Sequence, residues 1–166
     1  MTKPILSILF LVLFGYHISA NTLSLSTQDM YLDFNDRRLL AYKDVVLSTE
    51  GQEIKSPQSI VELDKERLVF LDGVTANIHS VRAYTDHFVF DWMAQKAEGN
   101  SKVDVYFKDY ELQAGAIQFN MEDNHILLTD KIQVNSPKQS ASADTAKIDL
   151  DRNQLDLKGN IQINAK

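Results

Sequence analysis

The sequence predicts an all-β protein, an antiparallel meander of about ten strands formed by five repeats of 29 residues. Three observations support this prediction. Apolar residues recur at a constant spacing of 29 residues, they alternate with polar residues inside each repeat, and polar turns separate the alternating runs. A period of two is that of a strand with one buried face, whereas a helix would need a period of 3.6.

The repeat is clearest in its last copy, residues 148–163, which read IDLDRNQLDLKGNIQI. Its apolar positions are Ile148, Leu150, Leu155, Leu157, Ile161 and Ile163. Subtracting 29 from these numbers one to four times gives the other copies, and of the thirty positions only Gly99 is not apolar. With 44% hydrophobic residues in the chain, about thirteen of thirty random positions would be apolar, so the recurrence indicates a repeated structural unit.

Each copy is predicted to form a strand, a turn and a returning strand. The position between the first two apolar residues is polar in every copy: Asp33, Glu62, Asp91, Asn120 and Asp149. The turns that follow read NDRR, DKER, MAQK, EDNH and DRNQ. A polar pair then interrupts each returning strand, namely Lys43-Asp44, Asp72-Gly73, Ser101-Lys102, Asp130-Lys131 and Gly159-Asn160. We interpret this pair as a bulge or bend, because two of the copies place Gly there.

Short segments rich in polar turn formers connect the repeats, and each is followed by a lead-in to the next strand. One face of every strand is therefore apolar and the other polar. Such a sheet must fold over on itself, as a sandwich, a roll or a groove, to cover its apolar face.

Residues 1–20 are expected to be a secretory signal peptide that is cleaved after Ala20. Lys3 is their only charged residue, and the run at residues 5–14 is almost entirely apolar. A helix from residue 5 to Ala20 would reach about 24 Å, against a hydrocarbon core of about 30 Å. The alternative is a retained single anchor in the membrane. A lipoprotein anchor is excluded, because the chain has no cysteine.

Residues 21–166 are expected to form one domain, since no linker divides them. Without cysteine, an exported domain must be held together by its core alone. The formal net charge of -6 and the lack of a basic tract argue against binding to nucleic acid.

Enzymatic chemistry is not expected. His17, His79, His87 and His125 show no metal-ligand spacing, so no metal site is expected. The sequence contains no nucleophile elbow and no phosphate-binding loop, and we expect no cofactor.

The segment SADTAKIDLDRNQLDLKGNIQI resembles the repeat of the OstA-like family of periplasmic lipopolysaccharide transport proteins, of LptA and LptC type, and is most similar to LptA. The matching features are Ala143-Asp144, the strand that begins at Ile148, the polar turn, and Gly159-Asn160 followed by Ile161. The similarity extends over residues 25–164, although the Gly-Asn pair is present only in the last copy.

The resemblance implies a V-shaped β-jelly roll whose apolar interior holds the acyl chains of lipopolysaccharide. The candidate residues for this groove are Leu63, Phe70, Phe88, Phe90, Trp92, Val103, Val105, Phe119, Met121 and Leu128. For any single one of these residues, an ordinary place in the hydrophobic core is the simpler interpretation. The basic residues at the turns are candidates to meet lipid phosphates or, equally, to keep the turns soluble: Arg37, Arg38, Lys65, Arg67 and Lys96.

Family members stack end to end, so the two outermost strands are expected to dock other proteins. The last strand, residues 154–164, ends two residues before the chain does and leaves an uncovered edge. The first strand, residues 22–34, changes its apolar parity near Gln28, which predicts a bend there. The expected docking residues are Leu32, Phe34, Ile161, Gln162 and Ile163.

The function implied by the resemblance is that of a noncatalytic, periplasmic carrier of lipopolysaccharide that bridges the inner and outer membranes. Its expected partners are the lipid A moiety, an LptC-like component at the inner membrane, an LptD-like component at the outer membrane, and further copies of itself. Two alternatives remain at this point. One is an LptC-like protein anchored in the inner membrane, and the other is a β-scaffold for envelope protein assembly that binds no lipid.

Overall fold

The computed structural model describes residues 24–49 and 51–166, so the expected signal peptide lies outside the described residues. The strands are β1 (Ser24–Ser26), β2 (Asp29–Asp33), β3 (Arg38–Thr49), β4 (Gln52–Glu62), β5 (Arg67–Ile78), β6 (Val81–Asp91), β7 (Lys96–Gly99), β8 (Val103–Phe107), β9 (Tyr110–Ala114), β10 (Ala116–Asn120), β11 (His125–Asn135), β12 (Gln139–Asp149), β13 (Gln154–Lys158) and β14 (Gln162–Ala165). One turn of 3-10 helix, η1 (Leu63–Lys65), lies between β4 and β5. The protein is therefore all-β over the residues that the structure describes.

The fourteen strands correspond to the ten predicted ones, because four of the ten are each split into two segments. The split strands are β1 with β2, β7 with β8, β9 with β10, and β13 with β14. The first of these interruptions falls at Thr27 and Gln28, which confirms the predicted bend near Gln28.

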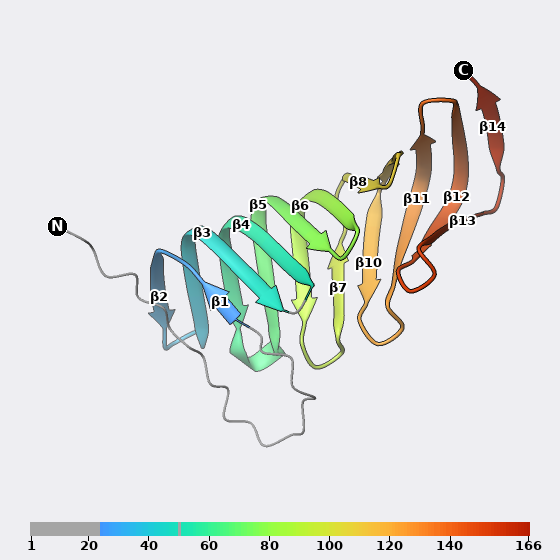
Figure 1. Cartoon of the computed structure of the whole chain (residues 1–166). Helices are drawn as coiled ribbons and strands as arrows, with labels where there is room; N and C mark the ends of the chain where they lie inside the picture. The colour runs from blue at the N-terminus through green and yellow to red at the C-terminus, as the bar shows by residue number, and fades with distance from the viewer. Residues whose placement is uncertain (1–23, 50) are drawn as a thin grey trace.

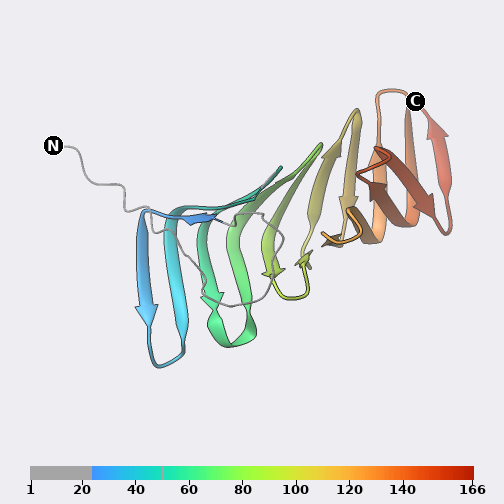
Figure 2. The ribbon, with the colours of Figure 1, turned by 60° about the horizontal axis from the view of Figure 1, so that its bottom comes forward.

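The strands form one antiparallel sheet in which neighbours along the chain are also neighbours in space. Figure 1 shows this meander running from β1 and β2 at one end of the molecule to β13 and β14 at the other. The same two ends remain furthest apart in Figure 2. The predicted meander is thus confirmed, and it makes the molecule long in the direction in which the repeats follow one another.

A bulge bends most returning strands at the predicted polar pair. Between β3 and β4, Tyr42 pairs with Gln58 and Val45 with Ser56, so that two residues of β3 lie opposite one residue of β4. Equivalent register shifts occur between β5 and β6 and between β11 and β12. The pairs that adopt positive φ are Lys43 with Asp44, Asp72 with Gly73, Asp130 with Lys131, and Gly159 with Asn160. The bend predicted from the polar pairs is therefore confirmed in these four copies.

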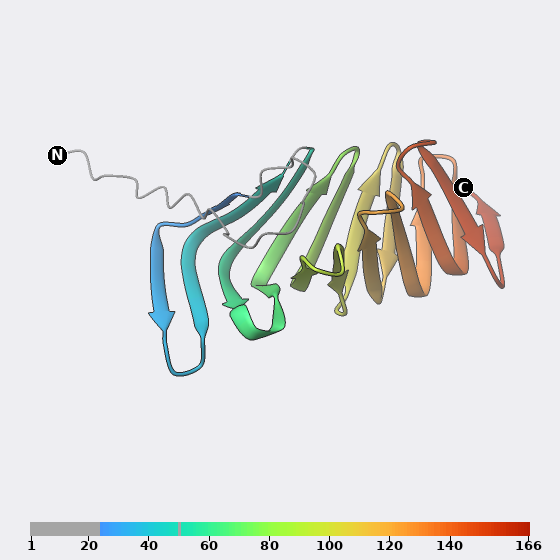
Figure 3. The same ribbon diagram turned by 90° about the horizontal axis from the view of Figure 1, so that it is seen from below.

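The third copy differs, because its strand is interrupted between Gly99 and Val103 instead of bulging within a continuous strand. In all copies the bends lie near the middle of the strands, and the sheet folds over there into two half-sheets, as Figure 3 shows along the length of the molecule. The bends are held across the strands by polar side chains. Gln28 donates a hydrogen bond to Asp44, Gln58 donates one to Asp72, and Asn160 donates one of 2.8 Å to Asp144.

The turns repeat as regularly as the strands. One residue of positive φ recurs in the turns at intervals of 29, with φ from 49° to 54°: Arg37, Glu66, Gln95, Asn124 and Asn153. The carbonyl oxygens of the first four accept hydrogen bonds from the backbone N–H groups of Leu63, Trp92, Met121 and Leu150, respectively. Each of these four turns is thereby joined to the next repeat. We call this row of backbone hydrogen bonds the turn ladder.

One hydrophobic core fills the inside of the folded sheet and includes residues from all five repeats. Many of its members are apolar positions of the 29-residue pattern, and others, such as Phe88, Phe107 and Ile117, come from the lead-ins and connections between the repeats. Gly99, the only exception in that pattern, has a packing reason. A Cβ at Gly99 would lie 3.0 Å from Ile117 Cγ2, 3.2 Å from Phe88 Cδ2 and 3.2 Å from the carbonyl oxygen of His87, so the core leaves no room for a side chain.

Candidate functional site

Seven of the ten residues predicted to form the groove are at most 4% exposed and belong to the core: Phe70, Phe88, Phe90, Val103, Val105, Phe119 and Leu128. Strands β5, β6 and β10 carry the four phenylalanines, and β11 carries Leu128. The interior of the isolated chain is thus mainly apolar, with few buried polar residues among those the structure describes, and these seven side chains pack inside it.

The other three predicted groove residues lie at the turns. Trp92 and Met121 are partly buried and pack against the core, whereas Leu63 is 37% exposed within η1. The backbone N–H groups of all three donate hydrogen bonds of the turn ladder. The distance from nitrogen to carbonyl oxygen is 3.3 Å for Leu63 and Trp92 and 3.0 Å for Met121. If the alternation of β6 continued beyond Asp91, Trp92 would point into the core. However, β6 ends at Asp91, and Trp92 already belongs to the turn.

The predicted docking residues lie exposed at the two ends of the sheet. At the amino-terminal end, Leu32 is 39% and Phe34 81% exposed, and β2 pairs only with β3 within the described chain. At the carboxyl-terminal end, Ile161 is 48% and Ile163 64% exposed, and Gln162 is exposed as well. There, β13 and β14 pair only with β12 among the described strands. Both ends therefore present a strand edge together with apolar side chains.

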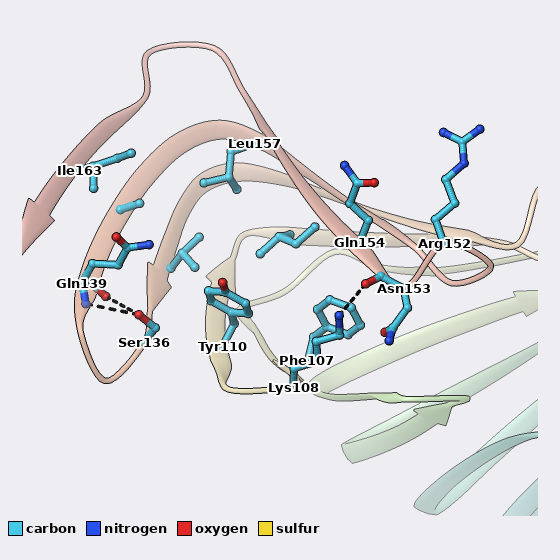
Figure 4. A pocket seen from close by; sticks show the side chains of 13 residues that line it. Phe107, Lys108, Tyr110, Ser136, Gln139, Arg152, Asn153, Gln154, Leu157 and Ile163 are labelled. Atoms are coloured by element: carbon cyan, nitrogen blue, oxygen red, sulfur yellow. Dashed lines mark hydrogen bonds between the residues drawn. The ribbon is translucent and has the colours of Figure 1, made fainter.

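A cavity of about 480 Å³, which we call the mouth cavity, lies at the carboxyl-terminal end of the roll. Figure 4 shows side chains from the β8–β9 turn, β12, the β12–β13 turn and β14 around it. Its lining residues are Phe107, Lys108, Tyr110, Val134, Ser136, Gln139, Ala141, Arg152, Asn153, Gln154, Leu155, Leu157 and Ile163. The lining therefore combines apolar side chains with neutral polar groups and two cations.

Lys108 joins the two turns at the edge of the mouth cavity. It has φ 53° in the tight turn between β8 and β9, and its Nζ donates a hydrogen bond of 2.6 Å to the carbonyl oxygen of Asn153. The same Nζ lies 5.2 Å from the centroid of the Phe107 ring, within the range of a cation–π contact. Within the described residues, the Lys108 ammonium thus takes the place at Asn153 that a backbone N–H takes at each of the four preceding turns.

Only Ile163 of the cavity lining was among the predicted site residues. Val134, Leu155 and Leu157 are positions of the 29-residue pattern, and their apolar character was visible in the sequence. Lys108 and Tyr110 lie in the segment between the third repeat and the next, which carries no repeated apolar signal. Nothing in the pattern indicates that the tip of the β8–β9 turn contacts a turn 45 residues further along the chain.

A second hollow, broader and about 1150 Å³ in volume, lies over the bends of β3, β4 and β5. Its lining contains charged groups of both signs, among them Asp29, Lys43 and Asp44. Lys43 donates a hydrogen bond to Asp29, and this hydrogen bond together with the negative charge of Asp29 raises the pKa of Lys43 above its ordinary value. These charges neutralise one another, so the hollow offers no excess of either sign.

Four of the five basic turn residues are paired with carboxylates. Arg37 lies 2.7 Å from Asp64, whereas Arg38, Lys65 and Arg67 surround Glu62, which is only 8% exposed. Burial acts to raise the pKa of Glu62, but hydrogen bonds from Arg67 and Lys65 and their positive charges outweigh it and hold the pKa below its ordinary value of 4.5. These four basic residues therefore form ion pairs at the turns of the isolated chain, and three of them share the Glu62 carboxylate.

The described residues contain no group of three or more His, Asp or Glu side chains placed to hold a metal ion. Over residues 24–49 and 51–166, no helix is long and apolar enough to cross a membrane. The mouth cavity offers a ligand apolar contacts, neutral hydrogen-bonding groups and the ammonium of Lys108.

Comparison with known proteins adds a resemblance at the level of structure. No protein-family model matches the chain, and no curated protein sequence matches it. Among solved structures, the chain is similar to LptH, described as the LptA homologous periplasmic component of the conserved lipopolysaccharide transport device from Pseudomonas aeruginosa. The two share 12% sequence identity and a TM-score of 0.35, over 87% of this chain and 94% of that one. At these values, the similarity carries no argument about the function of this chain.

Proposed function

We propose that this chain is a periplasmic lipopolysaccharide-binding transport protein of LptA type, a member of the OstA-like family that bridges the inner and outer membranes. One observation carries the proposal. A single apolar core runs through all five repeats, between two sheet ends that both expose strand edges and apolar side chains.

An apolar interior of this length suits acyl chains, because each methylene group transferred from water into it contributes about 0.8 kcal/mol. The interior of the isolated chain is filled by side chains such as Phe88 and Phe119, so bound acyl chains must replace contacts within the core. The strands pass from one half-sheet to the other at the bends, and on the opposite side Lys108 donates a hydrogen bond from the β8–β9 turn to Asn153 in the β12–β13 turn. We therefore expect the acyl chains to enter by parting the half-sheets on the side away from the bends, which at the carboxyl-terminal end requires this hydrogen bond to break.

The exposed ends suit stacking of copies end to end. A second copy could add its amino-terminal strand β2 to the edge formed by β13 and β14, which would extend the sheet and cover Ile161 and Ile163. In the same way, the turn ladder would continue from one copy into the next. The apolar interiors would then form one continuous path along the stack.

The proposed partners follow from the position of such a bridge. An LptC-like component would meet one end of the stack at the inner membrane, and an LptD-like component would meet the other end at the outer membrane. The chain itself acts passively, and ATP hydrolysis by a partner transporter at the inner membrane supplies the direction of transport. Export by a cleaved signal peptide at residues 1–20 belongs to this proposal.

Photocrosslinking in cells tests whether lipid occupies the interior. A photoreactive residue at Phe90, which points inward, is compared with one at Val89, its neighbour on the opposite face of β6. Crosslinks to lipopolysaccharide from position 90 and not from position 89, dependent on cellular ATP, are expected. Equal labelling of both positions, or none at position 90, would contradict the proposed function.

A second candidate function is a scaffold for envelope protein assembly that binds proteins at its strand edges and holds no lipid. The dense filling of the interior by Phe70, Phe88 and Phe119 favours this alternative. A photoreactive residue at Gln162, which lies on the exposed strand β14, separates the two functions. Crosslinks from Gln162 to protein, without any lipid crosslink from Phe90, would identify the chain as a scaffold.

An LptC-like protein anchored in the inner membrane differs from the proposed one at its amino terminus. The mass of the protein isolated from the periplasm decides between them. A chain that begins at Asn21 is expected for the LptA type, whereas retention of residues 1–20 in the membrane fraction would indicate the anchored type.

A further inference from the structure

The mouth cavity differs in charge from the rest of the chain. The sequence contains 23 acidic and 17 basic residues, so thirteen average residues would include about two carboxylates. The thirteen lining residues of the mouth cavity include no Asp or Glu, and they include Lys108 and Arg152. The cavity is therefore a locally positive site on an acidic protein.

Lys108 has hydrogen-bonding capacity left for a ligand. An ammonium group has three N–H donors, and the Asn153 carbonyl oxygen accepts one of them. Among the described residues, no carboxylate lies within ion-pair distance of Lys108, in contrast to Arg37, Arg38, Lys65 and Arg67. The positive charge of Lys108 is thus not paired with a carboxylate in the part of the chain that the structure describes.

Arg152 adds a second cation at the rim of the cavity. Its Nε lies 3.8 Å from Asp149, and its side chain is 79% exposed, with the guanidinium extending away from Lys108 in Figure 4. Lys108 is consequently the direct anchor for an anion in the observed conformation. Arg152 contributes to the local potential rather than to a fixed contact.

The rest of the lining is suited to an alkyl chain. Leu155 and Leu157 from β13 and Val134 from β11 form an apolar wall that is continuous with the core. The volume of about 480 Å³ lies within the range of roughly 300 to 1,000 Å³ that is typical of small-molecule sites. An apolar wall beside an unpaired ammonium matches a ligand with an alkyl chain and an anionic head.

We infer that the mouth cavity binds one alkyl chain of an amphiphile and that the Lys108 ammonium binds its phosphate head. The inference rests on the proposed function and deepens it, because it assigns the recognition of the anionic head to the carboxyl-terminal end of the roll. Charge complementarity selects this occupant over a neutral amphiphile or a second copy of the chain.

Calorimetric titration of the purified chain with three ligands tests the inference. The ligands are dodecyl phosphate, dodecyl maltoside and inorganic phosphate, with the two amphiphiles kept below their micelle-forming concentrations. We expect dodecyl phosphate to bind at least tenfold more tightly than dodecyl maltoside, and inorganic phosphate to bind far more weakly than either. Equal affinity for both amphiphiles would overturn the inference, and so would binding of inorganic phosphate as tight as that of dodecyl phosphate.

Variants place the binding in the mouth cavity. Lys108→Gln should reduce the affinity for dodecyl phosphate at least tenfold and leave that for dodecyl maltoside unchanged. The matched control is Lys158→Gln, a change of an exposed lysine on β13 that does not line the cavity and should have no effect. Ala141→Phe, which fills the cavity, should weaken the binding of both amphiphiles. The inference would be overturned if Lys108→Gln and Lys158→Gln reduced the affinity for dodecyl phosphate equally, or if two chains bound each ligand molecule.

The failure of this inference can be distinguished from the failure of the proposed function. If lipopolysaccharide is crosslinked from Phe90 while Lys108→Gln leaves the preference for dodecyl phosphate intact, the inference alone is wrong. If dodecyl phosphate binds as expected but no lipid is crosslinked from Phe90, the mouth cavity is an amphiphile site of a protein with another function.

Discussion

The Lys108 ammonium donates a hydrogen bond of 2.6 Å to the carbonyl oxygen of Asn153, across 45 residues of chain. In the four preceding turns, the carbonyl oxygen at the equivalent position accepts a backbone N–H from the following repeat. A lysine side chain therefore substitutes for the repeat that the last turn lacks. The substitution ties the tip of the β8–β9 turn to the carboxyl-terminal edge of the sheet and closes one side of the mouth cavity.

Replacement of Lys108 by Ala should strengthen end-to-end association. Phe34 holds the place in the first repeat that Leu63 and Trp92 hold in the next two, so the N–H of Phe34 in a second copy is the matching donor for the Asn153 carbonyl. Freeing that carbonyl removes a competing hydrogen bond worth about 1 kcal/mol, which corresponds to roughly a fivefold higher association constant. Sedimentation velocity over a range of protein concentrations measures this, with Lys158→Ala as the control. An unchanged or weaker association would show that Lys108 does not compete with stacking.

Replacement of Phe34 by Ser should weaken end-to-end association without reducing stability. The Phe34 side chain is 81% exposed in the isolated chain and contributes little to the core, but it would be covered in a stack. We expect the association constant to fall by a factor of roughly 10 to 150, since burial of a phenylalanine side chain contributes about 1.5–3 kcal/mol. Asn35→Ser, in the same turn, is the control for sedimentation, and thermal unfolding should be equal in both variants. If Phe34→Ser associates like the control, stacking does not use this edge.

Replacement of Glu62 by Gln should destabilise the fold by about 1–2 kcal/mol at neutral pH. The change removes the carboxylate that Arg38, Lys65 and Arg67 share, and it leaves these cations without their partner. The cations are themselves partly exposed, which limits the loss. Urea unfolding measures the effect, with Asp64→Asn as the control because it alters an exposed ion pair with Arg37.

The contribution of Glu62 should also depend on pH in a defined direction. The pKa of Glu62 in the folded chain lies below its ordinary value of 4.5. Its stabilising contribution is therefore fully present above pH 4.5 and is lost as the pH falls through the lower folded pKa. The difference in the free energy of unfolding between wild type and Glu62→Gln should shrink in that acidic range. A difference that stayed constant down to pH 3 would contradict this assignment.

Replacement of Gly99 by Ala should destabilise the fold by about 1–3 kcal/mol. The added Cβ would lie 3.0–3.2 Å from Ile117, Phe88 and the carbonyl oxygen of His87, and the backbone and the buried ring have little room to move. Asn100→Ala, a change at the adjacent exposed residue, should have an effect below about 0.5 kcal/mol. Denaturant unfolding compares the two. Equal stability of Gly99→Ala and wild type would mean that the core tolerates a larger residue at this repeat position.

The fold could be predicted in detail because each of its features recurs. A period of two identifies a strand with one buried face, and a spacing of 29 residues places equivalent residues in register on neighbouring strands. The polar pairs at Lys43-Asp44 and Gly159-Asn160 indicated bulges, and the change of parity near Gln28 indicated a bend. The one exception to the apolar pattern, Gly99, was visible in the sequence, but its reason became clear only from the contacts with Ile117 and Phe88.

The candidate site was less accessible to sequence reasoning. The inward position of Phe88 and Phe90 follows from strand alternation, whereas the partial exposure of Trp92 depends on where β6 ends and the turn begins. Whether an inward residue lines an open groove or fills a core depends on the distance between the two half-sheets, which the pattern does not contain. The structure places these residues in the core and places the mouth cavity at the carboxyl-terminal end.

The amino-acid sequence alone determined the all-β class, the repeat, the order of the strands, the inward face and the exposed edges, because all of these follow from local periodicity and from pairing between neighbours. The tertiary structure alone decided that the inward residues fill a core and that Lys108 meets Asn153 at the mouth cavity. The physical reason is that both features depend on how the sheet folds over at the bends and brings its two half-sheets together. Strand periodicity and pairing between neighbouring strands do not contain that distance.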